Sequence, residues 1–476
     1  METIIEEDNR ETETPSEWEL DRRRNFHIFC VDAFLHGIEL TILEPVEYFY
    51  YLNIMKTNTP VWHYSLSLAS SITSSLISSL LASYVVKKFK KYRVIYVHLI
   101  IFSIIGYLVY SIPLSPYFVI FGKFISGFGR GTNTVSSIYL QKRLYSSTDI
   151  QTKIGILSNI VTCGSILGPL FTFLFMHINT NMGHFTLTYA NLPGILLASI
   201  RLIHFIASFL LLTDLPRYDS PGRYLYIRGN FLKKFHLDGT VLDESKKPLL
   251  ELEEMSRDRD IDQSRRHERI SINQAFIEMC DIDLQLTFGA VFFSGIVYKI
   301  ISSLIAVEAP IYLDWELQHI TSLSFSNVLF GTIISGVTVW CMNYTNHVGN
   351  LLFGLLCGAI STILLSLLPL YSREKISATM LFCVMCVFNV LAACLIGLSA
   401  KLVTARFLPE RFTKLSDALR LCLTEAANIL GALFVPVVHL DLGICGVVIV
   451  SITTIFVIVC TFNFRRYFRG DCCRCK

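Results

Sequence analysis

Charged residues are scarce in this sequence. Only 17% of its 476 residues are Asp, Glu, Lys or Arg, whereas about a quarter is usual for a soluble domain. Hydrophobic residues make up 52%, and the mean hydropathy is +0.51. This composition excludes an ordinary soluble domain and predicts a polytopic membrane protein. The net charge of +3 is too small to indicate nucleic acid as a partner.

Motifs for enzymatic chemistry are lacking as well. We find no P-loop, no metal-ligand spacing, and no set of nucleophile, histidine and acid. We therefore expect neither an enzyme nor a bound cofactor. The first 25 residues are polar and acidic without an apolar core, so we expect no cleavable signal peptide. The first hydrophobic helix should then act as the targeting signal.

The 14 cysteines do not form a disulfide pattern. Most of them lie in hydrophobic segments, which argues against a disulfide framework. Cys383 and Cys386 have C-x-x-C spacing, but their position inside an apolar run favours packing over a metal or redox site. Cys472, Cys473 and Cys475 lie beside cations in the tail, where palmitoylation is favoured over metal binding.

Hydrophobic windows of about twenty residues recur along the chain. They cover residues 26–50, 63–86, 93–112, 117–140, 153–176, 191–213, 285–307, 322–341, 348–371, 377–403, 416–439 and 442–463. The pattern predicts an all-α membrane protein with two pseudo-symmetric halves of six transmembrane helices. The expected divisions are a tail (1–25), an N-terminal bundle (26–213), a linker (214–284), a C-terminal bundle (285–463) and a second tail (464–476).

Basic residues predict the orientation of these helices. They gather before the first window, after the second and fourth windows, in the linker, after the tenth window and in the tail. The other loops hold only Lys56, Arg373 and Lys375. We therefore expect both termini and the linker to face the cytosol. The sequon at Asn343 would then lie on the cytosolic side and remain without glycan.

The first window carries an acidic face. Asp32, His36 and Glu39 lie within about 60° of one another on a helix, and Glu47 lies just beside them. A charge at mid-membrane costs about 3 kcal/mol or more unless it faces protein or water. We therefore expect a polar interior here, with Glu39 as its centre. Glu44, Glu47 and Glu308 lie near the outer ends of their windows, where simple solvation is expected.

Several other windows contain ionisable residues. They are Lys123 and Arg130 in the fourth, Arg201 and His204 in the sixth, Lys299 in the seventh and Glu425 in the eleventh. Two interpretations remain open for them. They form structural ion pairs, foremost Glu39 with Arg130, or they line a transport cavity. Lys299 favours the cavity because its own window offers no acid at bilayer depth, and Arg201 is compatible with a pair to the first helix.

Small residues mark close helix contacts. Gly127, Gly129 and Gly131 in the fourth window clear space for a neighbouring backbone. Gly164 and Gly168, followed by Pro169, predict tight packing and a local bend in the fifth window.

These motifs resemble signatures of the major facilitator superfamily: GFGRG in the fourth window and G-x-x-x-G-P in the fifth. The loop KKFKKYR stands where that superfamily has G-x-x-x-D-R-x-G-R-R, with Lys87 in place of the Asp. The resemblance implies a central cavity lined by the first, fourth, seventh and tenth helices. Glu39, Lys123, Arg130 and Lys299 would then face one another.

The run FLHGIELTILEPVEYFYYL is similar to a narrower group. That group includes the lysosomal major facilitator superfamily domain-containing protein 8 and the transporter domain of SPX-type vacuolar phosphate transporters, although we expect no SPX domain before residue 26. The resemblance implies an endolysosomal membrane, with the plasma membrane as the alternative. The run Tyr224–Ile227 fits a tyrosine-based sorting signal that would contact a sorting adaptor, and a chance match is the alternative.

The functional hypothesis is a secondary transporter that works by alternating access. Four cations against few anions near the bilayer centre favour a small anionic or zwitterionic solute, and Glu39 is the candidate for proton exchange. The expected partners are membrane lipids, the solute and protons. An anion channel, with chloride as the ion, and a membrane scaffold that transports nothing remain alternatives.

Overall fold

The computed structural model describes residues 17–89, 91–141, 147–182, 185–215, 282–341, 346–371, 373–407 and 410–468. Within these ranges the chain is almost entirely helical, and the prediction of an all-α membrane protein is confirmed. The run Tyr224–Ile227, the sequon at Asn343 and the three tail cysteines lie outside the described residues.

In the described residues, the first half contains eight α-helices, one π-helix and a small hairpin. These are α1 (Glu17–Ile42), α2 (Glu44–Phe49), the π-helix η1 (Tyr50–Ile54), α3 (Pro60–Phe89), α4 (Tyr92–Tyr110), α5 (Pro116–Gly129), α6 (Gly131–Tyr139), α7 (Ser147–Phe175), β1 (Asn179–Met182), β2 (Phe185–Thr188) and α8 (Leu192–Leu211). The antiparallel pairing of β1 and β2, with Asn179 opposite Thr188, was not predicted from the sequence.

The second half consists of six long helices in the described residues. They are α12 (Ile282–Leu313), α13 (Leu317–Cys341), α14 (His347–Tyr371), α15 (Lys375–Phe407), α16 (Glu410–Leu440) and α17 (Leu442–Phe468). Each is longer than the roughly 20 residues needed to cross the hydrocarbon core of a bilayer. Each also covers one of the hydrophobic windows of the sequence.

The fourth membrane segment is divided between α5 and α6. Eleven helices are long and apolar enough to span a membrane alone, and this pair supplies the twelfth crossing in the described chain. The division falls at Arg130, whose backbone N–H donates to the Gly127 carbonyl at 3.1 Å. That i→i+3 bond tightens the turn within a glycine-rich run, where helix propensity is low.

The first membrane segment is also divided. Helix α1 ends at Ile42, and α2 begins at Glu44, after the single residue Leu43, with Pro45 in its first turn. Proline has no N–H to donate and therefore cannot continue the helical hydrogen bonds of α1. Thr172 of α7 donates its hydroxyl to the Ile42 carbonyl at 2.9 Å. The next turn is the π-helix η1, where the Met55 N–H reaches the Tyr50 carbonyl at 3.0 Å.

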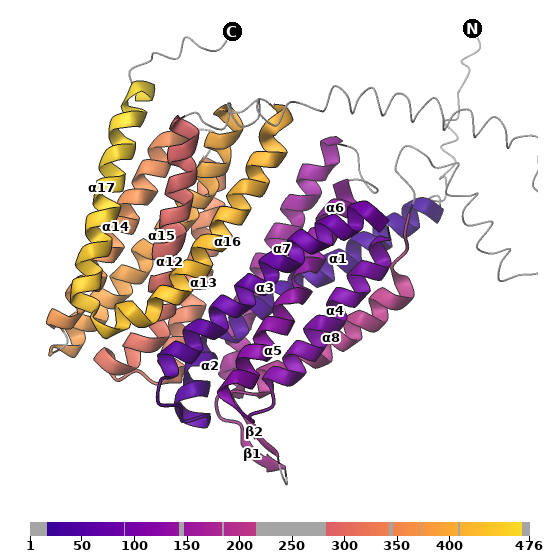
Figure 1. The fold of residues 1–476 in the computed structure, drawn as a ribbon, viewed down its shortest axis with the longest axis horizontal. Coiled ribbons are helices and arrows are strands. Elements are labelled where there is room, and N and C mark those ends of the chain that lie inside the picture. The colour runs from indigo at the N-terminus through magenta and orange to yellow at the C-terminus, as the bar shows by residue number, and fades with distance from the viewer. Residues whose placement is uncertain are drawn as a thin grey trace, which may run out of the picture.

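Two bundles lie side by side (Figure 1). We call the end where the described chain begins and finishes the terminal end, and the end with β1 and β2 the hairpin end. The bundles converge at the hairpin end and diverge toward the terminal end (Figure 1). Between the halves, α3 packs against α16, and α7 packs against α13.

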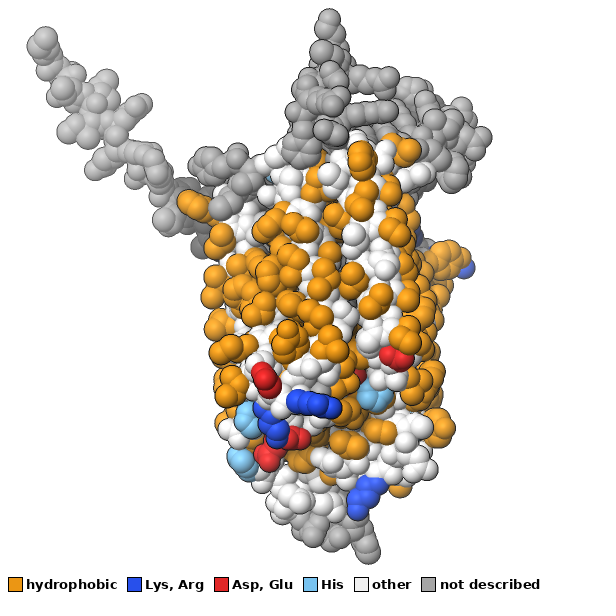
Figure 2. Space-filling view, turned by 90° about the vertical axis from the view of Figure 1, so that its left-hand side faces the viewer, with side chains coloured by type: hydrophobic (Ala, Val, Ile, Leu, Met, Phe, Trp, Pro, Cys, Tyr) orange, Lys and Arg blue, Asp and Glu red, His pale blue; other side chains and the backbone are white. Residues whose placement is uncertain are grey.

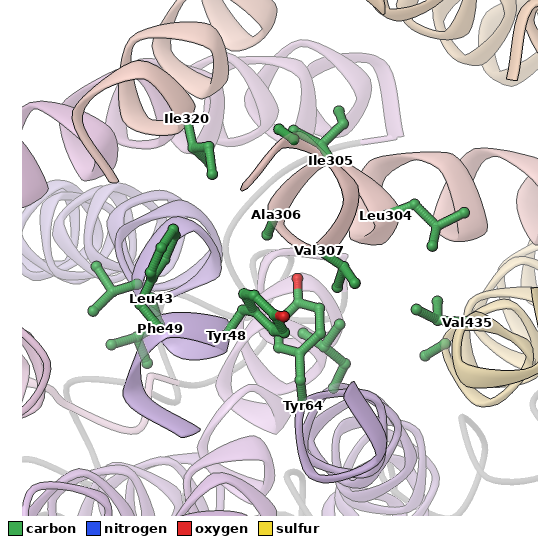
Figure 3. Packing of buried hydrophobic residues seen from close by; sticks show 14 of the residues in the cluster. Leu43, Tyr48, Phe49, Tyr64, Leu304, Ile305, Ala306, Val307, Ile320 and Val435 are labelled. Carbon is green, nitrogen blue, oxygen red and sulfur yellow. The ribbon is translucent and has the colours of Figure 1, made fainter. Parts of the chain in front are cut away.

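The distribution of buried apolar side chains explains this shape. One core at the hairpin end is shared by both halves. Figure 3 shows Leu43, Tyr48, Phe49 and Tyr64 of the first half facing Leu304, Ile305, Ala306, Val307, Ile320 and Val435 of the second. Two further cores near the terminal end belong to one half each. In the described residues, apolar packing therefore seals the hairpin end and leaves the halves separate at the terminal end.

The outer surface of the second half is apolar. A broad hydrophobic band covers the face shown in Figure 2, and charged side chains gather below it. On α17, the exposed residues include Ile444, Val447, Ile455 and Phe462. An exposed apolar band of this extent is expected where a protein meets lipid.

Helix α1 lies unusually close to α7. A Cβ atom on Gly164 would come within 2.1 Å of the Phe34 carbonyl oxygen, so only glycine fits there. Pro169 leaves the Ser165 carbonyl without its usual helical donor. The Thr41 hydroxyl donates to that carbonyl at 2.8 Å. Gly37 and Gly168 fit the same contact, and these features fix α1 against α7.

Candidate functional site

The acidic face of α1 meets a single arginine from α8. Arg201 binds both carboxylate oxygens of Glu39 through Nε and Nη2, the latter at 2.8 Å, and it donates to Asp32 through Nη1. All three side chains are buried. The expected pair of Glu39 with Arg130 is therefore wrong, because Arg201 occupies both Glu39 oxygens. The alternative of a pair between Arg201 and the first helix is the one found.

Two histidines flank this cluster. His204 Nδ1 lies 3.5 Å from Arg201 Nη1, and His204 Nε2 lies 3.3 Å from the Ser208 hydroxyl. His36 Nδ1 lies 3.9 Å from Glu39 Oε2. His204 is buried, whereas the His36 side chain retains 14% of its exposure.

Lys123 of α5 pairs with Glu47 of α2. Lys123 Nζ lies 3.1 Å from Glu47 Oε2, and the Ser67 hydroxyl of α3 donates to Glu47 Oε1. The expectation that Glu47 is solvated is wrong, because its side chain is completely buried. The divided first segment turns α2 inward, where the charge of Glu47 requires a partner.

Glu308 is also buried instead of solvated. Its carboxylate lies in the shared core near Val307 and is 2% exposed. His439 at the end of α16 approaches it with Nδ1 2.9 Å from Oε1. The expectation of solvation is wrong here because the seal at the hairpin end encloses this part of α12. The polar contact with His439 offsets the loss of water.

A cavity of about 300 Å³ lies between the two halves. The first half contributes α1, α2 and α7 to its wall, and the second half contributes α12, α13 and α15. Its polar lining consists of Thr41, Glu44, Thr162, Ser165, Tyr298, Ser302, Ser324, Asn327, Thr332, Ser335 and Asn389. Hydroxyl and amide groups make up most of this polar part, with one carboxylate among them, and apolar residues such as Ile305 and Val390 form the rest of the wall. Such a wall suits a small polar solute.

An ion pair crosses from one half to the other at this cavity. Lys299 Nζ of α12 lies 3.1 Å from Glu44 Oε1 of α2. The Glu44 side chain keeps 36% of its exposure, and that of Lys299 keeps 13%. Glu44 is therefore partly accessible, as expected, but it lines the cavity between the halves, and Lys299 contacts it directly from outside that lining. Lys299 therefore has its acidic partner on the other half of the molecule.

Arg130 and Glu425 face each other across the halves nearer the terminal end. The charges of Arg130, His36 and Lys299 all act on the Glu425 carboxylate, with Arg130 the strongest. Both side chains are partly buried. Among the residues that the structure describes, neither one forms an ion pair. They are opposite charges in range of each other but not in contact.

A family model of the Major Facilitator Superfamily matches residues 48–464. The chain belongs to the Major Facilitator Superfamily. A search of curated proteins finds no significant match.

Solved structures of this superfamily have the same fold. A POT family transporter in complex with 5-aminolevulinic acid has a TM-score of 0.63 and 15% identity, over 93% of this chain and 96% of that chain. A D-xylose-proton symporter has a TM-score of 0.64 and 12% identity, over 92% and 97%. The xylose transporter XylE from E. coli, in a partially occluded inward open conformation, has a TM-score of 0.61 and 14% identity, over 93% and 99%.

Membership in the Major Facilitator Superfamily makes this chain a membrane transporter of the secondary type. The expected grouping of Glu39, Lys123, Arg130 and Lys299 around one centre is wrong in its details. Glu39 and Lys123 are tied within the first half, to Arg201 and Glu47. Arg130 and Lys299 remain at the boundary between the halves.

The cavity also contains residues that the sequence analysis did not single out. Asn327 and Asn389 bring side-chain amides into the second-half wall, beside the Tyr298 hydroxyl. The available signal was an amide within an apolar window, since a polar group in a membrane helix needs a polar partner. Only ionisable side chains were taken as candidates from the sequence. In the described residues no cluster of His, Cys, Asp and Glu suits a metal ion.

The glycines of the fourth segment lie against neighbouring serines. A Cβ atom at these positions would meet the hydroxyl groups of Ser74 at Gly127, Ser103 at Gly129 and Ser78 at Gly131. Helices α5 and α6 can therefore approach both α3 and α4 closely. This contact presents Lys123 to α2 and leaves Arg130 at the boundary between the halves.

Proposed function

We propose that this chain is a secondary transporter that carries a small zwitterionic solute by alternating access, coupled to protons. The observation that carries the proposal is the Glu44–Lys299 pair, which joins the two halves at the wall of their shared cavity. A solute with one amino and one carboxylate group matches both members of the pair. Its amino group would bind Glu44, and its carboxylate would bind Lys299.

The charge balance supports a zwitterion over a simple anion. Two of the four cations expected near the centre, Arg201 and Lys123, already form buried ion pairs within the first half. At the cavity one carboxylate stands against one ammonium group. A lone anion would have to leave Glu44 without its partner, and an unpaired charge in a partly buried site is costly.

Competition between the solute and the ion pair supplies a reason for alternating access. In the described conformation, the Glu44–Lys299 pair holds the halves together beside the sealed hairpin end. A bound zwitterion replaces this one bond between the halves with two bonds to itself. A solved neighbour with the same fold binds 5-aminolevulinic acid, which also carries one amino and one carboxyl group.

We place the protein in endolysosomal membranes with the terminal end facing the cytosol. The location is supported by the similarity of the first segment to the lysosomal group and by the sorting-like run Tyr224–Ile227. The orientation is supported by the basic residues that gather in the loops at the terminal end. In this orientation the separated ends of the two halves face the cytosol.

Solute exchange in proteoliposomes tests the proposed substrate class. Purified protein is reconstituted, and trans-stimulated uptake is compared for alanine, glutamine and alanyl-alanine, for lactate as an anion, and for glucose as a neutral solute. We expect exchange of at least one zwitterion. We expect Glu44→Gln or Lys299→Met to reduce it by about tenfold or more, the loss expected for one charge-assisted hydrogen bond.

The matched control is a second Lys–carboxylate pair at the surface. Lys375 and Asp314 form an ion pair with both side chains more than 60% exposed, so Lys375→Met should leave exchange unchanged. Exchange of lactate or glucose alone would contradict the proposal. So would full exchange in both cavity variants, or a large unitary conductance, which would indicate a channel.

A further inference from the structure

The buried cluster on α1 contains more negative than positive charge. Asp32 and Glu39 share the single guanidinium of Arg201. Arg130 and Glu425 lie outside these ion pairs, toward the boundary between the halves. Within the cluster itself, two carboxylates therefore share one guanidinium group. An uncompensated charge within a membrane protein is costly, so this region requires one more positive charge.

His204 does not supply that charge. Its Nδ1 faces Arg201 Nη1 at 3.5 Å, and a guanidinium nitrogen can only donate. The same nitrogen lies 3.9 Å from Asp32 Oδ1, but the guanidinium is the nearer group and its positive charge opposes a proton on Nδ1. The proton of the ring is on Nε2, which faces the Ser208 hydroxyl at 3.3 Å. His204 is thus a neutral imidazole beside the cluster.

His36 meets the requirement. Its Nδ1 lies 3.9 Å from Glu39 Oε2, a suitable distance for an ion pair. The charged groups around it are Glu39 on its own helix, Arg201 of α8 behind Glu39, Arg130 of the same half, and Glu425 of α16 across the boundary. Helix α7 packs against α1 at this level through Val161 and Gly164, which do not ionise. A proton on His36 balances the whole group.

Accessibility also distinguishes His36 from the carboxylates. Asp32 and Glu39 are 1% and 2% exposed, and Arg201 holds them from α8. The His36 side chain is 14% exposed, and its charge reaches Glu425 on the opposite half. Water at the boundary can therefore exchange a proton with His36, whereas Glu39 stays enclosed behind it.

We infer that His36 is the proton-carrying side chain of this transporter, and that Glu39, fixed by Arg201, is its permanent counter-ion. The inference rests on the proposed proton coupling and replaces Glu39 as the group that exchanges the proton. A proton binds the imidazole from water on one side of the membrane. It leaves to water on the other side after the halves have changed position. The step needs no other reactant.

Uncoupling is the expected result of His36→Gln. Glutamine keeps a polar side chain but carries no proton, so zwitterion exchange without a pH gradient should fall less than gradient-driven accumulation. Accumulation driven by an imposed pH gradient should fall by about tenfold or more, and the solute should no longer move protons, as read by a pH dye inside the liposomes. His98→Gln is the control, since His98 is exposed and its Nδ1 bonds its own helix at Val94.

Gradient-driven accumulation that survives in His36→Gln would overturn the inference. If the wild type exchanges none of the zwitterions, the proposed substrate class fails, and histidine NMR of the wild type tests His36 separately. The His36 signal, assigned by its absence from His36→Gln, should change between the neutral and the protonated ring as pH falls. The His204 signal should stay that of a neutral ring. A His36 ring that never protonates would refute the inference without any transport measurement.

Discussion

Arg201 determines how the acidic face of α1 is accommodated. It is a fully buried guanidinium that binds two carboxylates from another helix. Arginine suits this position because its planar fork can bind one carboxylate through two nitrogens and still donate to a second. Lys123 needs only one partner, Glu47, because its ammonium is a compact charge.

We predict that Arg201→Met destabilises the protein strongly. Removing the shared cation leaves Asp32 and Glu39 buried and unpaired, which typically costs about 3–5 kcal/mol. The variant should show a large loss of monodisperse protein in thermal-stability measurements by size-exclusion chromatography. The triple variant with Asp32→Asn and Glu39→Gln should recover most of that loss.

The control for this prediction is again an exposed pair. Lys375→Met removes the partner of Asp314 at the surface, where such pairs contribute about 1 kcal/mol or less. Equal stability of Arg201→Met and Lys375→Met would show that the buried cluster is not a structural element of the first half.

At the scale of elements, the break between α1 and α2 lets the first membrane segment direct its carboxylates to different neighbours. Helix α1 presents Asp32, His36 and Glu39 to the first half. The break before Pro45 then redirects the chain, so that α2 places Glu44 against the second half and Glu47 against α5. The carboxylates of this one segment thus form ion pairs with three different cations.

The close contact of α1 with α7 yields a prediction at this scale. Gly164→Leu should prevent α7 from approaching α1, because even a Cβ atom would lie 2.1 Å from the Phe34 carbonyl oxygen. Overpacking costs about 1–3 kcal/mol or more, so we expect a clear fall in the melting temperature and loss of exchange. Gly155→Leu on the same helix is the control, since a Cβ there meets nothing within 4 Å. Similar stability of the two variants would contradict the packing argument.

At the scale of the whole molecule, the two halves share one apolar core at the hairpin end and have separate cores near the terminal end. This distribution corresponds to one state of an alternating-access cycle, in which the halves are sealed at the hairpin end and separate at the terminal end. The opposite charges of Arg130 and Glu425 face each other where the halves must approach in the other state.

Cysteine labelling in isolated endolysosomes tests this state together with the proposed orientation. Cys394 lines the cavity, so a membrane-impermeant maleimide added to the cytosolic side should label it. Cys386 lies buried in the shared core and should remain unlabelled, as peptide-level mass spectrometry would show. Labelling of Cys394 only after permeabilisation would contradict the orientation, and absence of the protein from these vesicles would contradict the location.

Much of the fold could be predicted from the sequence because membrane helices leave a local signal. Each of the twelve windows corresponds to a membrane segment, including the fourth, which is divided at Arg130. The hairpin β1–β2 was missed, since two strands of four residues produce no comparable apolar run. The helix breaks at Leu43 and Arg130 were not predicted, although Pro45 lies beside the first and a glycine-rich run surrounds the second. The only distortion that was predicted is a local bend at Pro169.

The candidate site was predictable only in part. The charged residues inside the windows were recognised, since each is costly in a membrane and must serve a purpose. Their pairing was not, because helical periodicity gives the face of a residue on its own helix but not the depth or rotation of the neighbouring helix. The choice of Arg130 over Arg201 as partner of Glu39 failed for this reason, and the burial of Glu47 and Glu308 was missed in the same way.

The sequence by itself determined that this protein spans a membrane in twelve segments and carries charge inside it. Both properties follow from composition and local pattern. The free energy of transferring a residue from water into lipid does not depend on residues that are distant in the chain. Only the tertiary structure decided that Arg201 neutralises α1, that Glu44 meets Lys299 beside the cavity, and that His36 remains accessible beside Glu39. Those contacts depend on how helices far apart in the chain pack together, and packing is a property of the whole fold.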